Sequence, residues 1–306
     1  MDYGCGGGYF TAVMENKMTN FLGIEKPYTE YNTARYAVLP VPFEHSTSYG
    51  SGTRQGPQAI LKASAYVELY DEEFNREAYK KGIHTCVPPS LTDNVEEAFE
   101  NMTRSVAGLL QDGKFPVVLG GEHSLSYPVF RAFNQHYENL SVLQFDAHSD
   151  LRFEYEDSIY SHASVMRRIY EINPNIAAVG IRSQCVEEAR FIHAKNIPVF
   201  YAHRLHEEGF DDAIIGQLQE NVYITFDVDY FDPSLIPATG TPEPGGFFWP
   251  ETIRFLTRLF RKRNVVGFDV VELAPLNNMP HPDFTIARLV YKLITLHDLT
   301  SGERQK

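Results

Sequence analysis

The 306-residue chain has few of the residues that build disulfide frameworks or thiolate metal sites, because its only cysteines are Cys5, Cys86 and Cys185. They are widely scattered and form no CxxC pair, which excludes a cysteine-ligated zinc site. Positive charge is also scarce, since 27 lysines and arginines stand against 40 acidic residues. The resulting net charge of −13 argues against nucleic acid or an anionic membrane as a partner.

Long hydrophobic runs are missing as well. No apolar run approaches the ~20 residues that are needed to span a bilayer. The glycine-rich N-terminus has neither the basic nor the apolar segment of a secretory signal. We therefore expect a cytoplasmic protein without a membrane partner. The 43% apolar content is ample for a core, and 306 residues suit one large domain or two small ones.

Three short apolar runs end in side chains that bind metals. The most informative is LSVLQFDAHSDLR at 140–152, where Asp146, His148 and Asp150 alternate after the apolar run. Residues two apart on an extended chain point to the same side, so these three can converge. The runs at 115–119 and 222–226 end in a similar way, in Glu122 and His123 and in Asp227, Asp229 and Asp232. Any one of these residues alone would suit a cap or a surface position, but the recurrence indicates one shared site.

Strand and helix patterns alternate along the whole chain, with no linker and no repeat. We expect strands at 35–42, 83–87, 115–119, 140–145, 176–181, 197–201, 222–226 and 265–271. Helices are expected from Gly56-Pro57 onward and at 93–112, 126–136, 162–170, 187–195, 211–219, 251–260 and 283–299. This order predicts one parallel sheet covered on both faces, with ligands bound beyond the carboxyl ends of the strands. A TIM barrel is the alternative, because eight strand–helix units fit that fold too.

Carboxylates and imidazoles without thiolates suit manganese, zinc or iron better than softer metals. Two divalent ions ~3.5–4 Å apart can lower the pKa of a water between them, which predicts metal-assisted hydrolysis. Two bridging carboxylates would let six residues hold both ions: His123, Asp146, His148, Asp150, Asp227 and Asp229.

Two other site types fit the residues less well. Asp227-Val228-Asp229 has the spacing of an aspartyl-phosphatase nucleophile motif, but Phe231 stands where that motif requires threonine or valine. Gly120-Gly121 would suit a phosphate loop only with a lysine downstream, and none follows there.

Four motifs, in this order and at these spacings, resemble the manganese ureohydrolases, the arginase and agmatinase family, and are most like bacterial agmatinases. They are GGEHS at 120–124, DAHSD at 146–150, SHASVMRR at 161–168 and FDVDYFDPSLIPATGTPEPGG at 226–246. The resemblance runs from about residue 35 to the C-terminus. It implies a three-layer αβα sandwich on an eight-stranded parallel sheet, which favours the open sheet over the barrel.

The resemblance also implies roles for individual residues. One manganese ion would be held by His123, Asp146, Asp150 and Asp227, and the other by Asp146, His148, Asp227 and Asp229. Asp150 would also accept a hydrogen bond from the attacking hydroxide. His162 matches the histidine that protonates the leaving amine, and Glu272 matches the glutamate that binds the guanidinium. A carboxylate suits that task because it pairs with a planar guanidinium through two hydrogen bonds.

Three positions depart from the family pattern. Glu122 stands where aspartate is usual, and we expect little effect because it is not a predicted ligand. Ala163 replaces a common glycine after the proton-transferring histidine. Leu276-Asn277-Asn278 replaces the usual agmatinase Pro-Tyr-Asp in the specificity loop.

The residues after the DAHSD motif bear on the tail of the substrate. Arginases place an asparagine just after DAHxD, and here that position is Arg152, followed by a loop with Glu154, Glu156 and Asp157. An acidic loop suits a cationic tail, so we expect agmatine, hydrolysed to putrescine and urea. N1-aminopropylagmatine fits equally, whereas Arg152 would favour a carboxylate substrate such as arginine, guanidinobutyrate or formiminoglutamate.

Three broader expectations follow. Residues 1–30 are predicted to form an N-terminal arm or subunit-contact segment, and residues 31–306 a single catalytic domain. The family resemblance implies a homo-oligomer, a trimer or a hexamer. A catalytically silent family member is the alternative to an enzyme, but it would be expected to have lost a ligand, His162 or Glu272.

Overall fold

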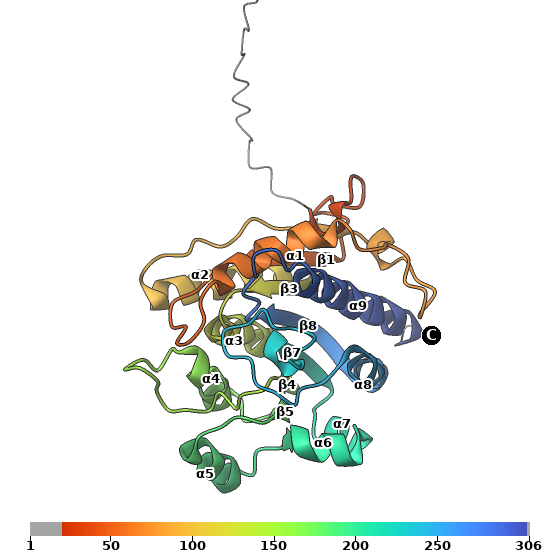
Figure 1. Ribbon diagram of the computed structural model, residues 1–306. Coiled ribbons are helices and arrows are strands. Elements are labelled where there is room, and N and C mark those ends of the chain that lie inside the picture. The colour runs from red at the N-terminus through yellow and green to blue at the C-terminus, as the bar shows by residue number, and fades with distance from the viewer. Residues whose placement is uncertain (1–19, 305–306) are drawn as a thin grey trace, which may run out of the picture.

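The computed structural model describes residues 20–304 as a layered α/β fold around one sheet (Figure 1). All eight strands are parallel and lie in the order β2-β1-β3-β8-β7-β4-β5-β6. This open sheet has two edge strands, so the barrel alternative is wrong and the predicted αβα sandwich is confirmed. The strands are β1 Tyr36–Val41, β2 Ile83–Thr85, β3 Phe115–Gly120, β4 Leu140–Phe145, β5 Ile176–Ile181, β6 Val199–Tyr201, β7 Asn221–Asp227 and β8 Asn264–Val271.

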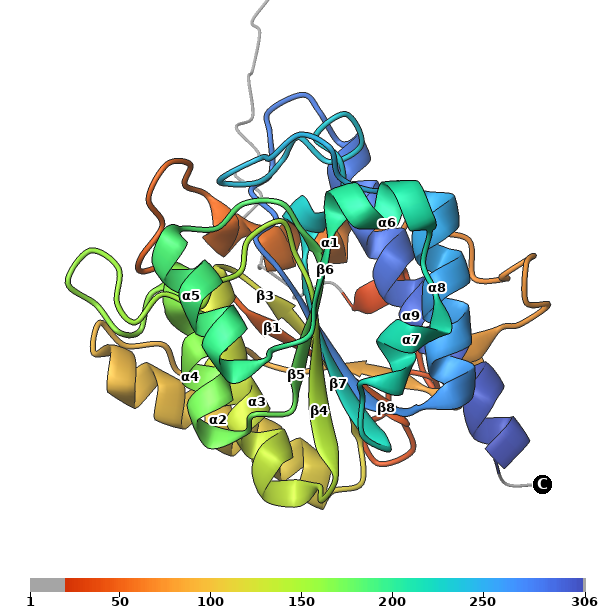
Figure 2. The same ribbon diagram turned by 90° about the horizontal axis from the view of Figure 1, so that it is seen from below.

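The sheet separates two hydrophobic cores, because alternate residues of each strand face opposite sides. In β1, Tyr36 and Val38 join one core while Ala37 and Leu39 join the other. Figure 2 shows the sheet edge-on between two helix layers. One layer contains α2 Val95–Gln111, α3 Ser126–His136, α4 Val165–Ile172 and α5 Val186–Lys195, and the other contains α1 Gly56–Ser64, α6 Ala202–Glu208, α7 Asp212–Gly216, α8 Trp249–Lys262 and α9 His281–Arg304.

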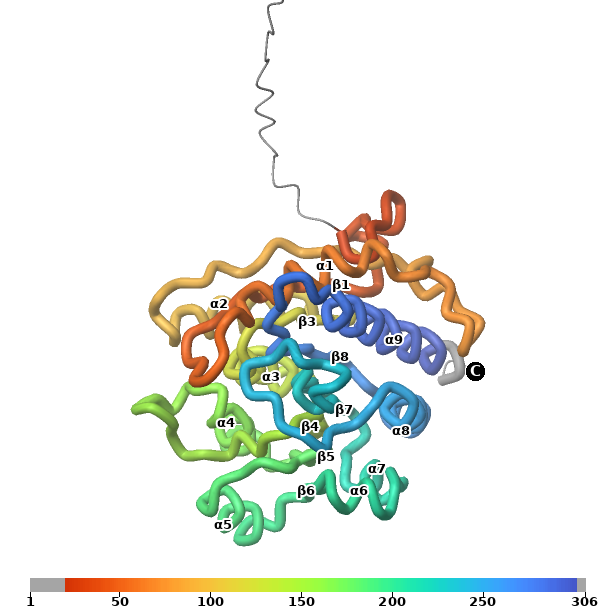
Figure 3. The backbone as a smooth tube through the Cα atoms, viewed as in Figure 1, coloured from red at the N-terminus to blue at the C-terminus, as the bar shows by residue number. Residues whose placement is uncertain are grey.

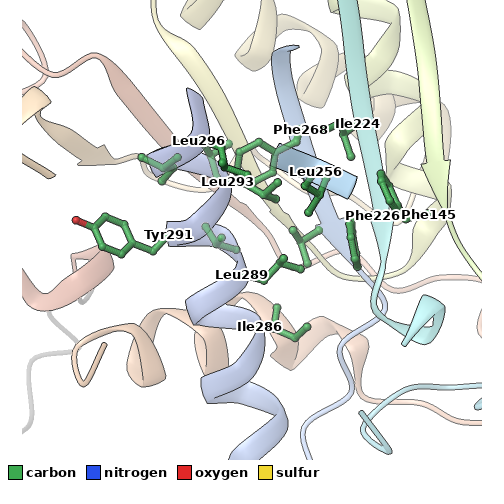
Figure 4. Packing of buried hydrophobic residues seen from close by; sticks show 14 of the residues in the cluster. Phe145, Ile224, Phe226, Leu256, Phe268, Ile286, Leu289, Tyr291, Leu293 and Leu296 are labelled. Atoms are coloured by element: carbon green, nitrogen blue, oxygen red, sulfur yellow. The ribbon is translucent and has the colours of Figure 1, made fainter. Parts of the chain in front are cut away.

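Helix α9 is central to the second layer. Figure 4 shows Leu289, Leu293 and Leu296 of this helix in the core cluster that also contains Phe226 and Phe268 of the sheet. These side chains are fully buried. Burial of large apolar side chains on both faces explains why the strands read as nearly continuous apolar runs rather than alternating ones.

The chain path places the ends of four central strands together. In Figure 3 the chain runs from β3 through β4, β5 and β6 toward one edge, then returns to the centre through β7 and β8. As a result β8 and β7 lie between β3 and β4, although β3 and β4 are consecutive in sequence. The carboxyl ends of β3, β8, β7 and β4 therefore meet, and this is where ligands bind in such sheets.

Two helix predictions need correction, and one helix was not predicted. Residues 162–164 form a 3-10 turn, and helix α4 begins only at Val165. The helix expected at 211–219 stops at Gly216, where Gln217 and Leu218 form tighter turn bonds to Ile214 and Ile215. Helix α6 was not predicted, because only Ala202 and Leu205 are buried in it and leave a weak apolar pattern.

The predicted N-terminal segment is only partly described. Residues 1–19 lie outside the described part of the chain. Phe21 and Leu22 are buried, and their backbone N–H groups donate to Thr85 Oγ1 (2.9 Å) and Ser64 Oγ (2.8 Å). The start of the described chain thus packs onto its own domain, and the division at residue 30 stays a prediction. Within residues 20–304, no helix is both long and apolar enough to cross a membrane.

Candidate metal centre and active site

The predicted ligands come together from three strand ends. His123 begins a 3-10 turn after β3, Asp146 follows β4 directly, and Asp227 is the last residue of β7. Asp229 lies in the next turn, and its side chain accepts a hydrogen bond from the Ala147 N–H (2.9 Å). The sequence-predicted convergence is therefore present in the structure.

Two groups of potential ligands share one aspartate. The first contains His123, Asp146 and Asp227, and the second contains Asp146, His148 and Asp229. His123 Nδ1 lies 3.1 Å from Asp146 Oδ2, 3.0 Å from Asp150 Oδ2 and 3.4 Å from Asp227 Oδ2. His148 Nδ1 lies 2.8 Å from Asp229 Oδ2. Two neighbouring groups of this kind match the donor set of a two-metal site.

The tautomer of His123 is fixed by a buried chain of polar groups. Its Nε2 lies 2.8 Å from Thr225 Oγ1, which in turn donates to Asp269 Oδ1 at 2.8 Å. Because the threonine proton is directed to Asp269, the Nε2–H of His123 donates to the threonine oxygen. In this tautomer Nδ1 carries a lone pair, and it makes no hydrogen bond within residues 20–304 although three carboxylate oxygens lie 3.0–3.4 Å away. Such an orphaned nitrogen facing carboxylates fits a metal ligand.

The charges of the cluster also call for added cations. Burial, followed by the nearby charges of Asp229 and Asp150, raises the pKa of Asp146 to about 7. Burial and the same kind of repulsion from Asp229 and Asp146 raise the pKa of Asp227 well above its usual range. Closely packed carboxylates ionise together only when positive charge compensates them.

Two functional candidates have strained backbones. Asp150 has φ +52° and Glu272 has φ +66°, in a region that non-glycine residues rarely adopt. Glu272 follows β8, and its Oε1 accepts a hydrogen bond from the His123 N–H at 2.6 Å. Burial, then the charge of Glu122, raises the pKa of Glu272 to about 8. Among the described residues no lysine or arginine forms an ion pair with Glu272, and a guanidinium bound beside it would favour its ionised form.

The cluster opens into a cavity of about 310 Å³. His123, His148, Asp150, Asp227, Asp229 and Glu272 line it, and His162 lines it as well. Arg152 and Tyr155 also face this cavity, with the Arg152 guanidinium 5.1 Å from the Tyr155 ring centroid.

Some predicted residues lie elsewhere. Asp232 does not join the cluster, because its side chain accepts hydrogen bonds from Ser234, Gly245 and Gly246 of its own loop. Glu154, Glu156 and Asp157 are exposed and do not line the cavity. The acidic-loop argument for a cationic tail therefore loses its direct structural support.

Three residues around the site were missed by sequence reasoning. Thr225 and Asp269 orient His123, and the signal was a polar residue inside each of two apolar strands. Ser46 contacts His162. It lies in the loop between β1 and α1, which is rich in glycine, serine and threonine, and nothing in the sequence distinguishes it from the other hydroxyl residues there.

The model of the Arginase family matches residues 34–295, which is most of the chain. The chain belongs to the arginase family. It is 39% identical over 277 residues to N(1)-aminopropylagmatine ureohydrolase of Synechocystis sp., covering 87% of this chain and 90% of that one. It is 40% identical to the protein of the same name from Thermus thermophilus, covering 90% of this chain and 94% of the other.

Other members of the arginase family share the fold. An agmatinase from Pyrococcus horikoshii is 35% identical, with 89% of this chain and 95% of that chain covered. The crystal structure of agmatine ureohydrolase of Thermoplasma volcanium matches with a TM-score of 0.84 at 29% identity, covering 93% and 96%. The family resemblance predicted from the sequence motifs is thus confirmed.

Proposed function

We propose that this arginase-family chain hydrolyses an alkylguanidine with an amine tail, agmatine in the first place, to urea and the free amine. The observation that carries the proposal is the meeting of two metal-ligand groups, a buried unpaired glutamate and a histidine around one cavity. The relatives named agmatinase and N(1)-aminopropylagmatine ureohydrolase support the same chemistry.

The metal site would hold two manganese ions. Four residues, His123, Asp146, Asp150 and Asp227, would bind one ion, and Asp146, His148, Asp227 and Asp229 the other. The orphaned His123 Nδ1 and the crowded carboxylates fit this assignment. Bound divalent ions would supply a water of lowered pKa as the nucleophile. Oxygen and imidazole donors suit manganese, and metal analysis of the purified protein tests the identity and the number of ions.

The remaining steps belong to side chains. Glu272 orients the guanidinium, because one of its oxygens is fixed by the His123 N–H and its negative charge is otherwise uncompensated. Asp150 accepts a hydrogen bond from the attacking water and directs it to the guanidinium carbon. His162 gives its proton to the amine nitrogen as the C–N bond breaks, which converts a poor leaving group into a neutral amine.

A second candidate substrate is N1-aminopropylagmatine, favoured by the names of the relatives at 39% and 40% identity. The two substrates share the guanidine and the four-carbon spacer and differ only beyond the first amine. Arg152 at the cavity wall is the observation against this whole class, since it would pair with a carboxylate.

Urea release from a panel of substrates tests the proposal. The manganese-loaded protein is given agmatine, N1-aminopropylagmatine, arginine and 4-guanidinobutyrate, and kcat/KM is compared. Faster turnover of either amine-tailed substrate supports the proposal. Preference for a carboxylate tail would assign Arg152 to specificity and overturn the substrate class. If the protein binds two ions but releases urea from none of the substrates, a catalytically silent family member explains the result better.

Two further expectations are kept as proposals. A homo-oligomer, a trimer or a hexamer, is tested by sedimentation of the purified protein. A cytoplasmic location fits the two described cysteines, Cys86 and Cys185, both of which are free thiols, and cell fractionation tests it.

A further inference from the structure

Glu122 is fully buried next to the predicted ligand His123, and its carboxylate binds the loop before α1. Its Oε2 accepts hydrogen bonds from the backbone N–H groups of His45 (2.5 Å) and Ser46 (2.6 Å). Its Oε1 accepts from Ser46 Oγ (2.9 Å) and from Ser124 Oγ. Four donors fill the capacity of a carboxylate, so Glu122 has no oxygen left for a metal ion or a substrate.

The Ser46 hydroxyl connects this anchor to His162. Ser46 Oγ accepts from the His162 backbone N–H at 3.0 Å and lies 3.3 Å from His162 Nδ1. A serine hydroxyl has one proton and two lone pairs, and here the proton is donated to Glu122. Ser46 can therefore only accept from the imidazole, which favours the neutral ring with its proton on Nδ1. The Ser161 hydroxyl lies slightly farther from the same nitrogen, at 3.4 Å.

The other side of the His162 ring is also held. The Tyr155 ring meets it edge-on with centroids 5.7 Å apart, and the Arg152 guanidinium lies over Tyr155. Ser46 and Tyr155 come from loops more than a hundred residues apart in sequence. The ring is thus fixed between two independent loops, with Nε2 as the nitrogen left to exchange a proton.

We propose that Ser46, anchored by Glu122, is a positioning residue that holds His162 in the Nδ1–H tautomer for proton transfer. The inference rests on the proposed function, because it takes His162 as the proton donor to the leaving amine. When the C–N bond breaks, its electron pair stays on the amine nitrogen and the proton moves there from Nε2. The ring is left neutral, with its remaining proton on Nδ1 directed to Ser46.

This role gives Glu122 a significance that its place in the sequence does not suggest. Glutamate replaces the usual aspartate of the motif, and we expected little effect from that change. Glutamate has one methylene more than aspartate, so its carboxylate reaches the backbone N–H groups of His45 and Ser46. The structure thus links the residue before a predicted metal ligand to the predicted proton donor.

A double-mutant cycle tests the inference. The enzymes compared are the wild type, Ser46→Ala, His162→Ala and the double variant, each loaded with manganese and analysed for bound metal. We expect Ser46→Ala to lower kcat about tenfold with KM changed by less than about twofold and the metal content unchanged. In the His162→Ala background the same substitution should have no further effect on kcat, because a residue that acts only through His162 loses its role there.

Two further variants complete the test. Ser46→Thr keeps the hydroxyl and should retain most of the wild-type kcat. Ser51→Ala removes an exposed hydroxyl from the same loop and should change nothing. Equal losses from Ser46→Ala in both backgrounds, or loss of manganese from Ser46→Ala, would overturn the inference in favour of a general structural role. By contrast, a wild type that releases no urea would refute the proposed function itself, and a fully active His162→Ala would refute the role of His162 as the proton donor on which the inference rests.

Discussion

Two regions of this molecule bury carboxylates, and they solve the problem of charge in different ways. Asp71 is fully buried against Lys292, with Oδ2 2.7 Å from the ammonium nitrogen, and Lys292 is only 2% exposed. Asp146, Asp227 and Asp229 are buried together at the strand ends, with histidines but no lysine or arginine side chain paired to them among the described residues. In the first region a lysine of the chain compensates the carboxylate, whereas the strand-end cluster is suited to binding metal cations.

The difference separates a structural site from a functional one. The ion pair between Asp71 and Lys292 joins α9 to the segment around residue 71. In the strand-end cluster, burial and mutual repulsion raise the pKa of Asp146 to about 7, and bound cations would favour its ionised form. Asp269 shows a third solution, since hydroxyl groups of Thr225 and Tyr223 donate to it.

Removing one carboxylate from the strand-end cluster should have the largest effect. Asp146→Asn removes the aspartate shared by both ligand groups, so we expect loss of bound manganese and at least a thousandfold drop in kcat. The reason is that bound metals lower the activation barrier by several kcal/mol. Metal analysis and urea release measure this. Asp232→Asn, outside the cluster, is the control, and a variant that keeps two ions per chain would break the comparison.

The proton donor comes next in size. His162→Ala should lower kcat by about a hundredfold or more, the usual contribution of a general acid, without loss of metal. The measurement is steady-state urea release together with metal analysis. His193→Ala replaces an exposed histidine of α5 and should behave as wild type. An unchanged kcat in His162→Ala would show that His162 is not the general acid that protonates the leaving amine.

The paired region should respond in stability and not in activity. Lys292→Met leaves Asp71 buried without a cation, and we expect the free energy of unfolding to fall by about 3–5 kcal/mol. Urea release per folded molecule should not change. Lys262→Met removes the exposed partner of Asp212 and should leave the free energy of unfolding close to that of the wild type. Denaturant unfolding measures both, and equal losses would show that burial is not what distinguishes the pairs.

Exposed acids should matter least. Glu156→Gln combined with Asp157→Asn neutralises two side chains that do not line the cavity. Because water and salt screen such charges, we expect KM for agmatine to change by less than about twofold at physiological ionic strength. Kinetics at low and high salt check this. A much larger rise in KM would restore the acidic loop as a determinant of the substrate tail.

Much of the fold could be read from the sequence. The strands at 140–145 and 176–181 and the helix at 126–136 have the predicted bounds, because buried parallel strands are continuous apolar runs and Ser126 to His136 has a regular helical period. The short helix α6 escaped prediction because only two of its side chains are buried. Weakly patterned elements of this kind are set by packing against their neighbours.

The sequence by itself indicated which side chains would gather, since Asp146, His148, Asp150, Asp227 and Asp229 alternate after apolar runs. In the structure they meet through turns and not through an extended chain, because Asp150 has a positive φ and Asp229 lies in a 3-10 turn. The sequence also determined the αβα class through the alternation of strands and helices. Only the tertiary structure decided that β8 and β7 lie between β3 and β4, which assembles the ligands from distant segments. The same packing decided the partners of His123 and His162, because their hydrogen bonds to Thr225 and Ser46 depend on positions in space that no local pattern encodes.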